Sequence, residues 1–174
     1  MNQLRRYALV LAVYFNTRGF AFILFESSLS PFDWGIREVR GLGKQRRCLA
    51  SIVRILDRYL PDVLVIQDTS PSGTRRAWRI AKLNSIVAEM AEERGIPVYA
   101  YSRADVYRAF QSMGFTNKHT LAELIATHIP AFERYVPPPR KPWMSEDARM
   151  GLFDAAALAL VFFQREGGGA QQAA

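Results

Sequence analysis

The sequence predicts an α/β protein in which one mixed sheet is covered by helices on both faces. Three apolar segments near the start suit strands joined by turns, and two later apolar segments alternate with helical patterns. The change from two-residue to 3.6-residue spacing of apolar side chains distinguishes strands from helices. With 174 residues, of which 49% are hydrophobic, the chain is long enough for one ordinary domain with its own core.

The first three strands are predicted as a meander. Tyr7–Phe15 and Phe20–Glu26 are rich in apolar and β-branched residues, and the Asn-Thr-Arg-Gly segment between them is typical of a turn. A break follows at Ser30 and Pro31. In the next segment, Trp34–Arg40, one set of side chains (Trp34, Ile36, Glu38) alternates with another (Gly35, Arg37, Val39). This alternation favours a third strand with one solvated face.

Two helices and two strands continue the pattern. Lys44–Leu60 and Arg75–Arg94 have apolar residues at helical spacing, and Pro61 and Gly95 follow them as terminators. Val63–Ile66 is continuously apolar and too short for a helix, so it fits a strand that is buried on both faces. Val98–Tyr101 supplies the fifth strand.

The last third of the chain is predicted to be helical. Two short helices, Arg103–Ser112 and Lys118–His128, precede a proline-rich connection and a final helix. Ser145 suits the N-cap of that helix, and the acidic residues after it suit its positive end. The tail 167–174 has no apolar periodicity, so we expect residues 1–166 to form the single domain and the tail to be disordered.

The net charge of +7 favours a polyanionic partner, although charge alone does not distinguish nucleic acid from an anionic surface. The apolar stretch near the start is interrupted by Asn16 and Arg18, which favours a strand over a signal peptide. No apolar run approaches the roughly 18 residues of a membrane span, and Cys48 has no possible intramolecular partner. We therefore expect a cytoplasmic protein without a membrane partner.

Three segments, taken in order, resemble the RuvC branch of the ribonuclease H-like superfamily. Leu11–Ala21 resembles the opening hairpin of that family, and Pro61–Asp68 resembles a strand that ends at a catalytic acid. Pro139–Asp147 followed by Asp154–Leu160 resembles its final helix, with an Asp-Ala-x-Ala-x-Ala type of pattern. The likeness extends over residues 7–165, and it depends on the order and combination of the segments.

The resemblance implies a ribonuclease H-like fold with a mixed five-stranded sheet, a homodimer, and branched DNA as the partner. It also implies two Mg²⁺ or Mn²⁺ ions held by three or four carboxylates. Two positions depart from this pattern, because Tyr14 stands at the aspartate position and Gln67 at the glutamate position. A phenol and an amide are poor replacements for carboxylate ligands of hard cations.

Three acids are candidates for catalysis: Asp68, Asp154 and Asp147. Helical spacing places Asp154 on the buried face of the last helix, where either a metal ion or a structural ion pair would compensate its charge. Asp68 follows the buried strand at the edge where ligands commonly bind, with a loop cap as the alternative. Asp68 and Asp154 are therefore the predicted metal ligands, whereas Asp147 also suits the positive end of a helix.

Basic residues predict the nucleic-acid surface. One cluster follows the Asp68 loop on the second helix, and another precedes the final helix beside Trp143; they comprise Arg75, Arg76, Arg79, Lys82, Arg140 and Lys141. Clustered cations neutralise phosphates, and an exposed aromatic residue beside them suits a nucleic-acid strand. The alternatives are a solvated helix face and a rigid proline connector.

Two functions follow from these patterns. The first is a structure-selective DNA-binding protein that acts as a divalent-metal-dependent endonuclease on branched DNA. The second is a catalytically inactive relative that serves in nucleic-acid binding or protein assembly. The residues Tyr14 and Gln67 favour the second function, and Asp154 favours the first.

Overall fold

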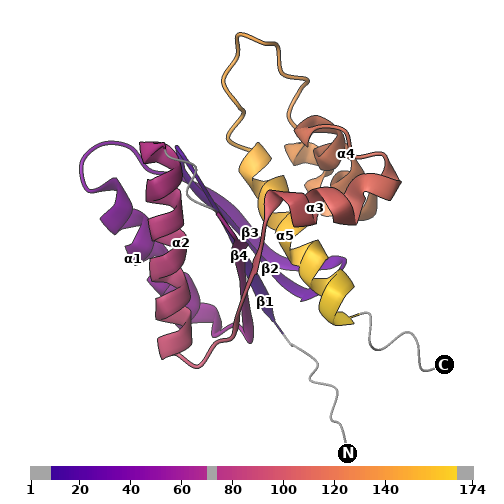
Figure 1. The fold of residues 1–174 in the computed structure, drawn as a ribbon. Coiled ribbons are helices and arrows are strands. Elements are labelled where there is room, and N and C mark those ends of the chain that lie inside the picture. Colours follow the sequence, from indigo (N-terminus) through magenta and orange to yellow (C-terminus); the bar gives the residue numbers. More distant parts are fainter. Residues whose placement is uncertain (1–8, 70–73, 168–174) are drawn as a thin grey trace, which may run out of the picture.

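The computed structural model describes residues 9–69 and 74–167, and these fold around one five-stranded sheet (Figure 1). The strands are β1 (Val10–Asn16), β2 (Gly19–Ser27), β3 (Ser30–Glu38), β4 (Val63–Gln67) and β5 (Val98–Tyr101), in the order β3-β2-β1-β4-β5. The first three strands pair antiparallel, whereas β4 runs parallel to β1 and β5 runs parallel to β4. The predicted mixed sheet of five strands is confirmed.

Successive side chains of the central strands enter two different cores. In β1, Val10 and Ala12 belong to one core, while Leu11 and Val13 belong to the other. The four apolar residues of β4 alternate in the same way. Because neighbouring side chains of a strand point to opposite faces, both strands are buried on both sides, as their continuous apolar sequences predict.

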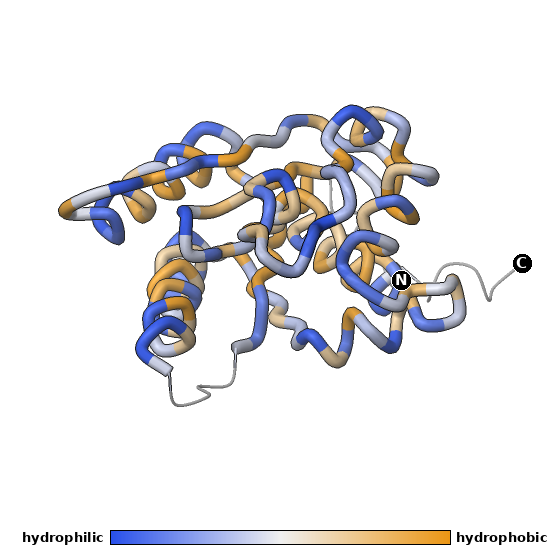
Figure 2. The backbone as a smooth tube through the Cα atoms, turned by 90° about the horizontal axis from the view of Figure 1, so that it is seen from above, coloured by the Kyte–Doolittle hydropathy of each residue, from blue (hydrophilic) through white to orange (hydrophobic). Residues whose placement is uncertain are grey.

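Helices cover both faces of the sheet, as predicted (Figure 1). One face carries α1 (Lys44–Tyr59) and α2 (Arg75–Glu93). The other carries α5 (Met150–Gly167), with α3 (Arg103–Phe110), η1 (Gln111–Met113), α4 (Lys118–His128) and η2 (Pro130–Tyr135) beside it. In Figure 2 the turns of α2 change between hydrophilic and hydrophobic colours, as an amphipathic helix requires. Within the described ranges, no helix has the length and hydropathy needed to cross a membrane.

The third strand begins earlier than predicted, at Ser30 rather than at Trp34. Ser30 and Pro31 look like a break in the sequence, yet Ser30 pairs with Ser27 and Pro31 pairs with Phe25. Proline is tolerated here because β3 is an edge strand and the pairing is irregular beside it. The prediction was therefore wrong at this boundary.

The final helix begins later than predicted, at Met150, so Ser145 is not its N-cap. The Asp147 carboxylate accepts hydrogen bonds from the backbone N–H and the side chain of Arg149, at 2.9 Å each for Oδ1. Such a local bond between side chain and backbone competes with helix formation. Ser145 instead accepts a hydrogen bond of 3.0 Å from Arg18 in the β1–β2 turn. The predicted tail lies outside the described residues after Gly167.

The turn between β1 and β2 requires glycine at position 19. Gly19 has a φ of +152°, and a Cβ atom added there would lie 1.9 Å from the carbonyl oxygen of Arg37 in β3. Asn16 Oδ1 stabilises the turn by accepting hydrogen bonds from the N–H groups of Arg18 and Gly19, at 2.9 and 3.1 Å. The close approach of β3 thus fixes the residue type.

Gly19→Ala is expected to lower the free energy of unfolding by about 3 kcal/mol, because a backbone clash adds to conformational strain. Urea denaturation measures this loss. Gly95→Ala is the matched control, because Gly95 also has a positive φ of +69° but an added Cβ would meet no atom within 4 Å. We expect the control to lose about 1–2 kcal/mol, and an equal loss in both variants would contradict the clash.

Candidate nucleic-acid interface

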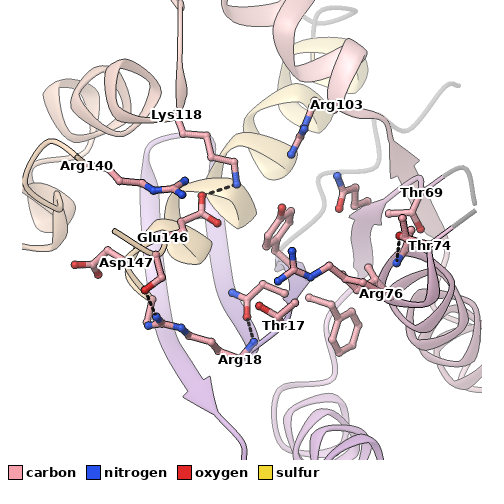
Figure 3. Close-up of a pocket in the computed structure, with 18 of the residues that line it drawn as sticks. Thr17, Arg18, Thr69, Thr74, Arg76, Arg103, Lys118, Arg140, Glu146 and Asp147 are labelled. Atoms are coloured by element: carbon pink, nitrogen blue, oxygen red, sulfur yellow. Dashed lines mark hydrogen bonds and ion pairs between the residues drawn. The ribbon is translucent and has the colours of Figure 1, made fainter. Parts of the chain in front are cut away.

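A cavity of about 710 Å³ opens where the carboxyl ends of β1 and β4 meet the start of α2 (Figure 3). Its walls also include the first residues of α3 and α4 and the loop before α5. Ligands commonly bind at this edge of an α/β sheet, because connecting loops and helix N-termini converge there. Segments that lie far apart in the sequence therefore meet around one cavity.

Positive side chains outnumber negative ones in this cavity. Five cations line it against three carboxylates: Arg18, Arg76, Arg103, Lys118 and Arg140 against Asp68, Glu146 and Asp147. Glu146 and Asp147 are already paired, with Lys118 and Arg149 respectively, at 2.7 Å each. Among the described residues, neither Arg76 nor Arg103 has a carboxylate within ion-pair distance. Both point toward the middle of the cavity in Figure 3, so they are available to an anionic ligand.

Lys118 connects the cavity to the core. Its Nζ lies 2.7 Å from Glu146 Oε1 and 3.2 Å from Asp154 Oδ2, and 5.8 Å from the centre of the Tyr14 ring. The side chain of Asp154 is only 11% exposed. A buried carboxylate requires a compensating partner, and here the Lys118 ammonium supplies it. Of the alternatives predicted for Asp154, the structure shows the ion pair.

Burial governs the protonation of this network. It raises the pKa of Asp154 from 3.8 to about 6, and the nearby Lys118 ammonium limits that rise. Burial also raises the pKa of Tyr14, and the Asp154 carboxylate adds to the effect. Burial opposes the charge of Lys118, but its acidic neighbours, Asp154 first, outweigh this and raise its pKa. At neutral pH the pair is therefore predominantly charged.

The side chains around Asp154 do not fit a pair of divalent metal ions. Tyr14 and Gln67 join Asp154 in lining a smaller cavity of about 220 Å³, and they contribute a phenol and an amide. Gly151, one helical turn before Asp154, has no side chain to offer, and the Lys118 ammonium already neutralises the carboxylate. No three His, Cys, Asp or Glu side chains in ranges 9–69 and 74–167 form a group that could hold a metal. One carboxylate that is already paired with an ammonium does not supply the several carboxylates that would hold two such ions side by side.

The structure does not bring Asp68 and Asp154 into one cavity. Asp68 lines the larger cavity and Asp154 lines the smaller one. Asp68 continues the strand, since its N–H donates a hydrogen bond of 2.8 Å to the Tyr101 carbonyl. Because neighbouring side chains of a strand point to opposite faces of the sheet, Gln67 lies on the α5 face and Asp68 on the opposite face.

Asp147 lines the larger cavity from the loop before α5, where Arg149 lowers its pKa. The predicted catalytic and metal roles of the three acids stay predictions.

The predicted basic residues divide into two groups. Arg76 and Arg140 line the cavity, and the others do not: Arg75, Arg79, Lys82 and Lys141. These four are exposed outside it. Lys82 lies over the Trp78 ring at 5.2 Å, and Lys141 lies over the Trp143 ring at 5.4 Å. The predicted helix strip therefore forms a surface beside the cavity, with Arg76 at its inner edge.

Sequence reasoning missed three cations of the cavity: Arg18, Arg103 and Lys118. Arg103 and Lys118 are the first residues of α3 and α4, where the helix macrodipole disfavours positive charge. A cation at a helix start indicates a compensating acid or ligand nearby, so a signal was present for these two. Arg18 lies in a tight turn, and nothing in its local pattern distinguished it.

Lys118→Met is expected to raise the pKa of Asp154 above about 6. The folded-state pKa of this acid already exceeds the ordinary 3.8, so its contribution to stability is greatest at low pH and declines as pH rises through the folded pKa. Without Lys118 the pKa of Asp154 is higher, so its contribution to stability continues to fall up to a higher pH. The variant should therefore lose about 1–2 kcal/mol more unfolding free energy at pH 8 than at pH 5, measured by urea denaturation. Lys118→Arg should not show this increase, and equal losses at both pH values in the Met variant would count against the ion pair.

Several solved structures share this fold at low sequence identity. The RuvC of Thermus thermophilus in complex with a Holliday-junction substrate matches with a TM-score of 0.69 and 17% identity, over 93% of this chain and 97% of that one. The yeast mitochondrial Holliday-junction resolvase Ydc2 matches at 0.63 and 13%, over 98% and 86%. The fowlpox virus resolvase with junction DNA matches at 0.52 and 11%, over 87% and 97%. No protein-family model and no curated protein matches the sequence. The predicted RuvC-like form of the ribonuclease H-like fold is confirmed, and this chain has it.

Proposed function

We propose that this chain binds branched DNA through the basic cavity at the carboxyl edge of its sheet. The observation that carries the proposal is the pair of arginines, Arg76 and Arg103, which line the cavity without an acidic partner in the described residues. Arginine binds phosphate oxygens through two parallel hydrogen bonds. The structures of T. thermophilus RuvC and fowlpox virus resolvase with Holliday-junction DNA support the choice of a branched substrate.

The shape of the interface supports recognition of DNA structure rather than base sequence. The arginines lie on different elements, since Arg76 belongs to α2 and Arg103 to α3, on opposite sides of the sheet edge. Phosphates of two strands that diverge at a branch point reach such a recessed site, whereas a regular duplex presents a convex surface. Phosphate contacts fix position and orientation but do not read bases. The proposed specificity is therefore for branched geometry.

Metal-dependent cleavage of the bound DNA is the second candidate function. Only Asp154 favours it, as a buried carboxylate at the expected edge of the sheet. Bound Mg²⁺ or Mn²⁺ would activate water and stabilise phosphorane charge, but Tyr14, Gln67 and Lys118 surround Asp154 with the wrong ligands. We therefore propose binding without cleavage, by the described domain. The expected homodimer and cytoplasmic location stay predictions.

A four-way junction is expected to bind at least about tenfold more tightly than duplex DNA of equal length, because several phosphates enter the cavity together. Fluorescence anisotropy at several salt concentrations measures both affinities. Arg76→Ala and Arg103→Ala should each weaken junction binding and reduce the salt slope by about one. Arg54→Ala on α1 is the charge-matched control, since Arg54 is exposed outside the cavity. Equal affinity for junction and duplex would refute the proposal.

Calorimetric titration with Mn²⁺ is expected to give no saturable heat for either the wild type or Asp154→Ala, because the ligand set is incomplete. Labelled junction DNA incubated with the wild type and Mg²⁺ should remain uncut. Metal-dependent cleavage would instead be supported by saturable Mn²⁺ binding that disappears in Asp154→Ala, together with symmetrical cleavage products. The two measurements are independent of the DNA affinity.

A further inference from the structure

The loop between η2 and α5 presents an exposed aromatic residue, Trp143. In Figure 1 this orange segment arches away from the body of the protein at the start of α5. Trp143 is 78% exposed, more than Trp78 at 58%. The Lys141 ammonium lies over its ring, 5.4 Å from the ring centre. An indole ring with this exposure, next to a cation, is free to stack on a flat ring of a ligand.

The backbone holds Trp143 in a fixed turn. The Met144 N–H donates a hydrogen bond of 3.0 Å to the Lys141 carbonyl, which closes a turn with Pro142 and Trp143 in the middle. Proline fixes φ at the first central position of such a turn. The Arg140 side chain also donates a hydrogen bond to the Met144 carbonyl. The backbone of the turn therefore has less conformational freedom to lose when the indole ring meets a ligand.

The same loop is fastened to the basic cavity. Ser145 accepts a hydrogen bond of 3.0 Å from Arg18, and Glu146 pairs with Lys118 at 2.7 Å. Arg140, at the beginning of the turn, lines the cavity as well. The C-terminal flank of the turn that carries the indole ring is therefore bonded to the cavity wall, and Arg140 on the other flank lines the cavity.

From this placement we propose that Trp143 stacks on an unpaired base at the branch point of DNA held in the cavity. The proposal rests on the proposed function, and it adds a base-stacking site to the phosphate site. Residues 136–145 contain Arg140 and Lys141 and no acid, so the charge of the turn complements a nucleic-acid backbone. Indole rings stack on every base without reading its identity, which agrees with selection by structure.

The test compares two DNA molecules that differ only in one base. Both are three-way junctions with one extra nucleotide at the branch point; in one this nucleotide carries thymine, and in the other it is abasic. The phosphate charge is identical in both. The wild type is expected to bind the thymine junction about tenfold more tightly, since one stacked base has an effect of this size.

Trp143→Ala is expected to bind both junctions equally and at the weaker level, with an unchanged salt slope because no charge is removed. Trp143→Phe should keep part of the preference. Trp78→Ala is the matched control: it removes an exposed tryptophan that also lies beside a lysine but belongs to α2 rather than to the turn before α5, and it should keep the full preference. Urea denaturation of all variants verifies that they fold.

The results separate this proposal from the proposed function. If the wild type prefers junctions to duplex but does not distinguish thymine from the abasic site, only the stacking site is overturned. A preference that survives in Trp143→Ala overturns it as well. If Trp143→Ala changes only the oligomeric mass, measured by light scattering, and leaves DNA binding unchanged, Trp143 contacts a second copy of the chain and the stacking site is overturned. A wild type without any preference for branched DNA overturns both proposals.

Discussion

The Lys118 ammonium between Asp154 and Glu146 is the interaction on which the shape of the cavity depends. It joins the start of α4, the second turn of α5 and the loop before α5 at one point. The carboxylate of Asp154 is buried, so loss of its cation would leave an uncompensated charge in the protein. The position of Lys118 is thus determined by the cost of burying Asp154. The loop that carries Glu146 is held by the same charge.

The ion pair between Lys118 and Asp154 also distinguishes this site from the metal-dependent site that the resemblance to RuvC implies. An ammonium group neutralises a carboxylate as a metal ion does, but it does not turn a bound water into a hydroxide nucleophile at neutral pH. The strand ends beside it carry Tyr14 and Gln67 rather than acids. The site has an excess of cations, and two of its guanidinium groups have no acidic partner within residues 9–69 and 74–167. These properties suit the proposed phosphate binding, which requires no reaction.

The sequence was sufficient for features that depend on periodicity. The sheet, the helices on its two faces and the inward position of Asp154 all follow from the spacing of apolar side chains. Features that depend on contacts between distant segments could not be found in this way. Ser145 resembles a helix cap locally, yet it binds Arg18, which lies 127 residues earlier in the chain. Pro31 resembles a break, yet the edge of the sheet tolerates it. Lys118 stood at a predicted helix start, but only the fold revealed Asp154 and Glu146 as its partners.

In the proposed complex, the loop before α5 combines electrostatic attraction with stacking on an exposed base. Ser145 and Glu146, which follow the turn, bind Arg18 and Lys118, so the segment after Trp143 is tied to the wall of the cavity. Electrostatic attraction acts on any polyanion and becomes weaker as the salt concentration rises. Stacking on the indole ring requires an unpaired base, and it depends little on salt. A regular duplex provides only the negative charge, because its bases are already stacked on one another. A branch point provides both the charge and an unpaired base, and the distance between cavity and turn then determines which branches fit.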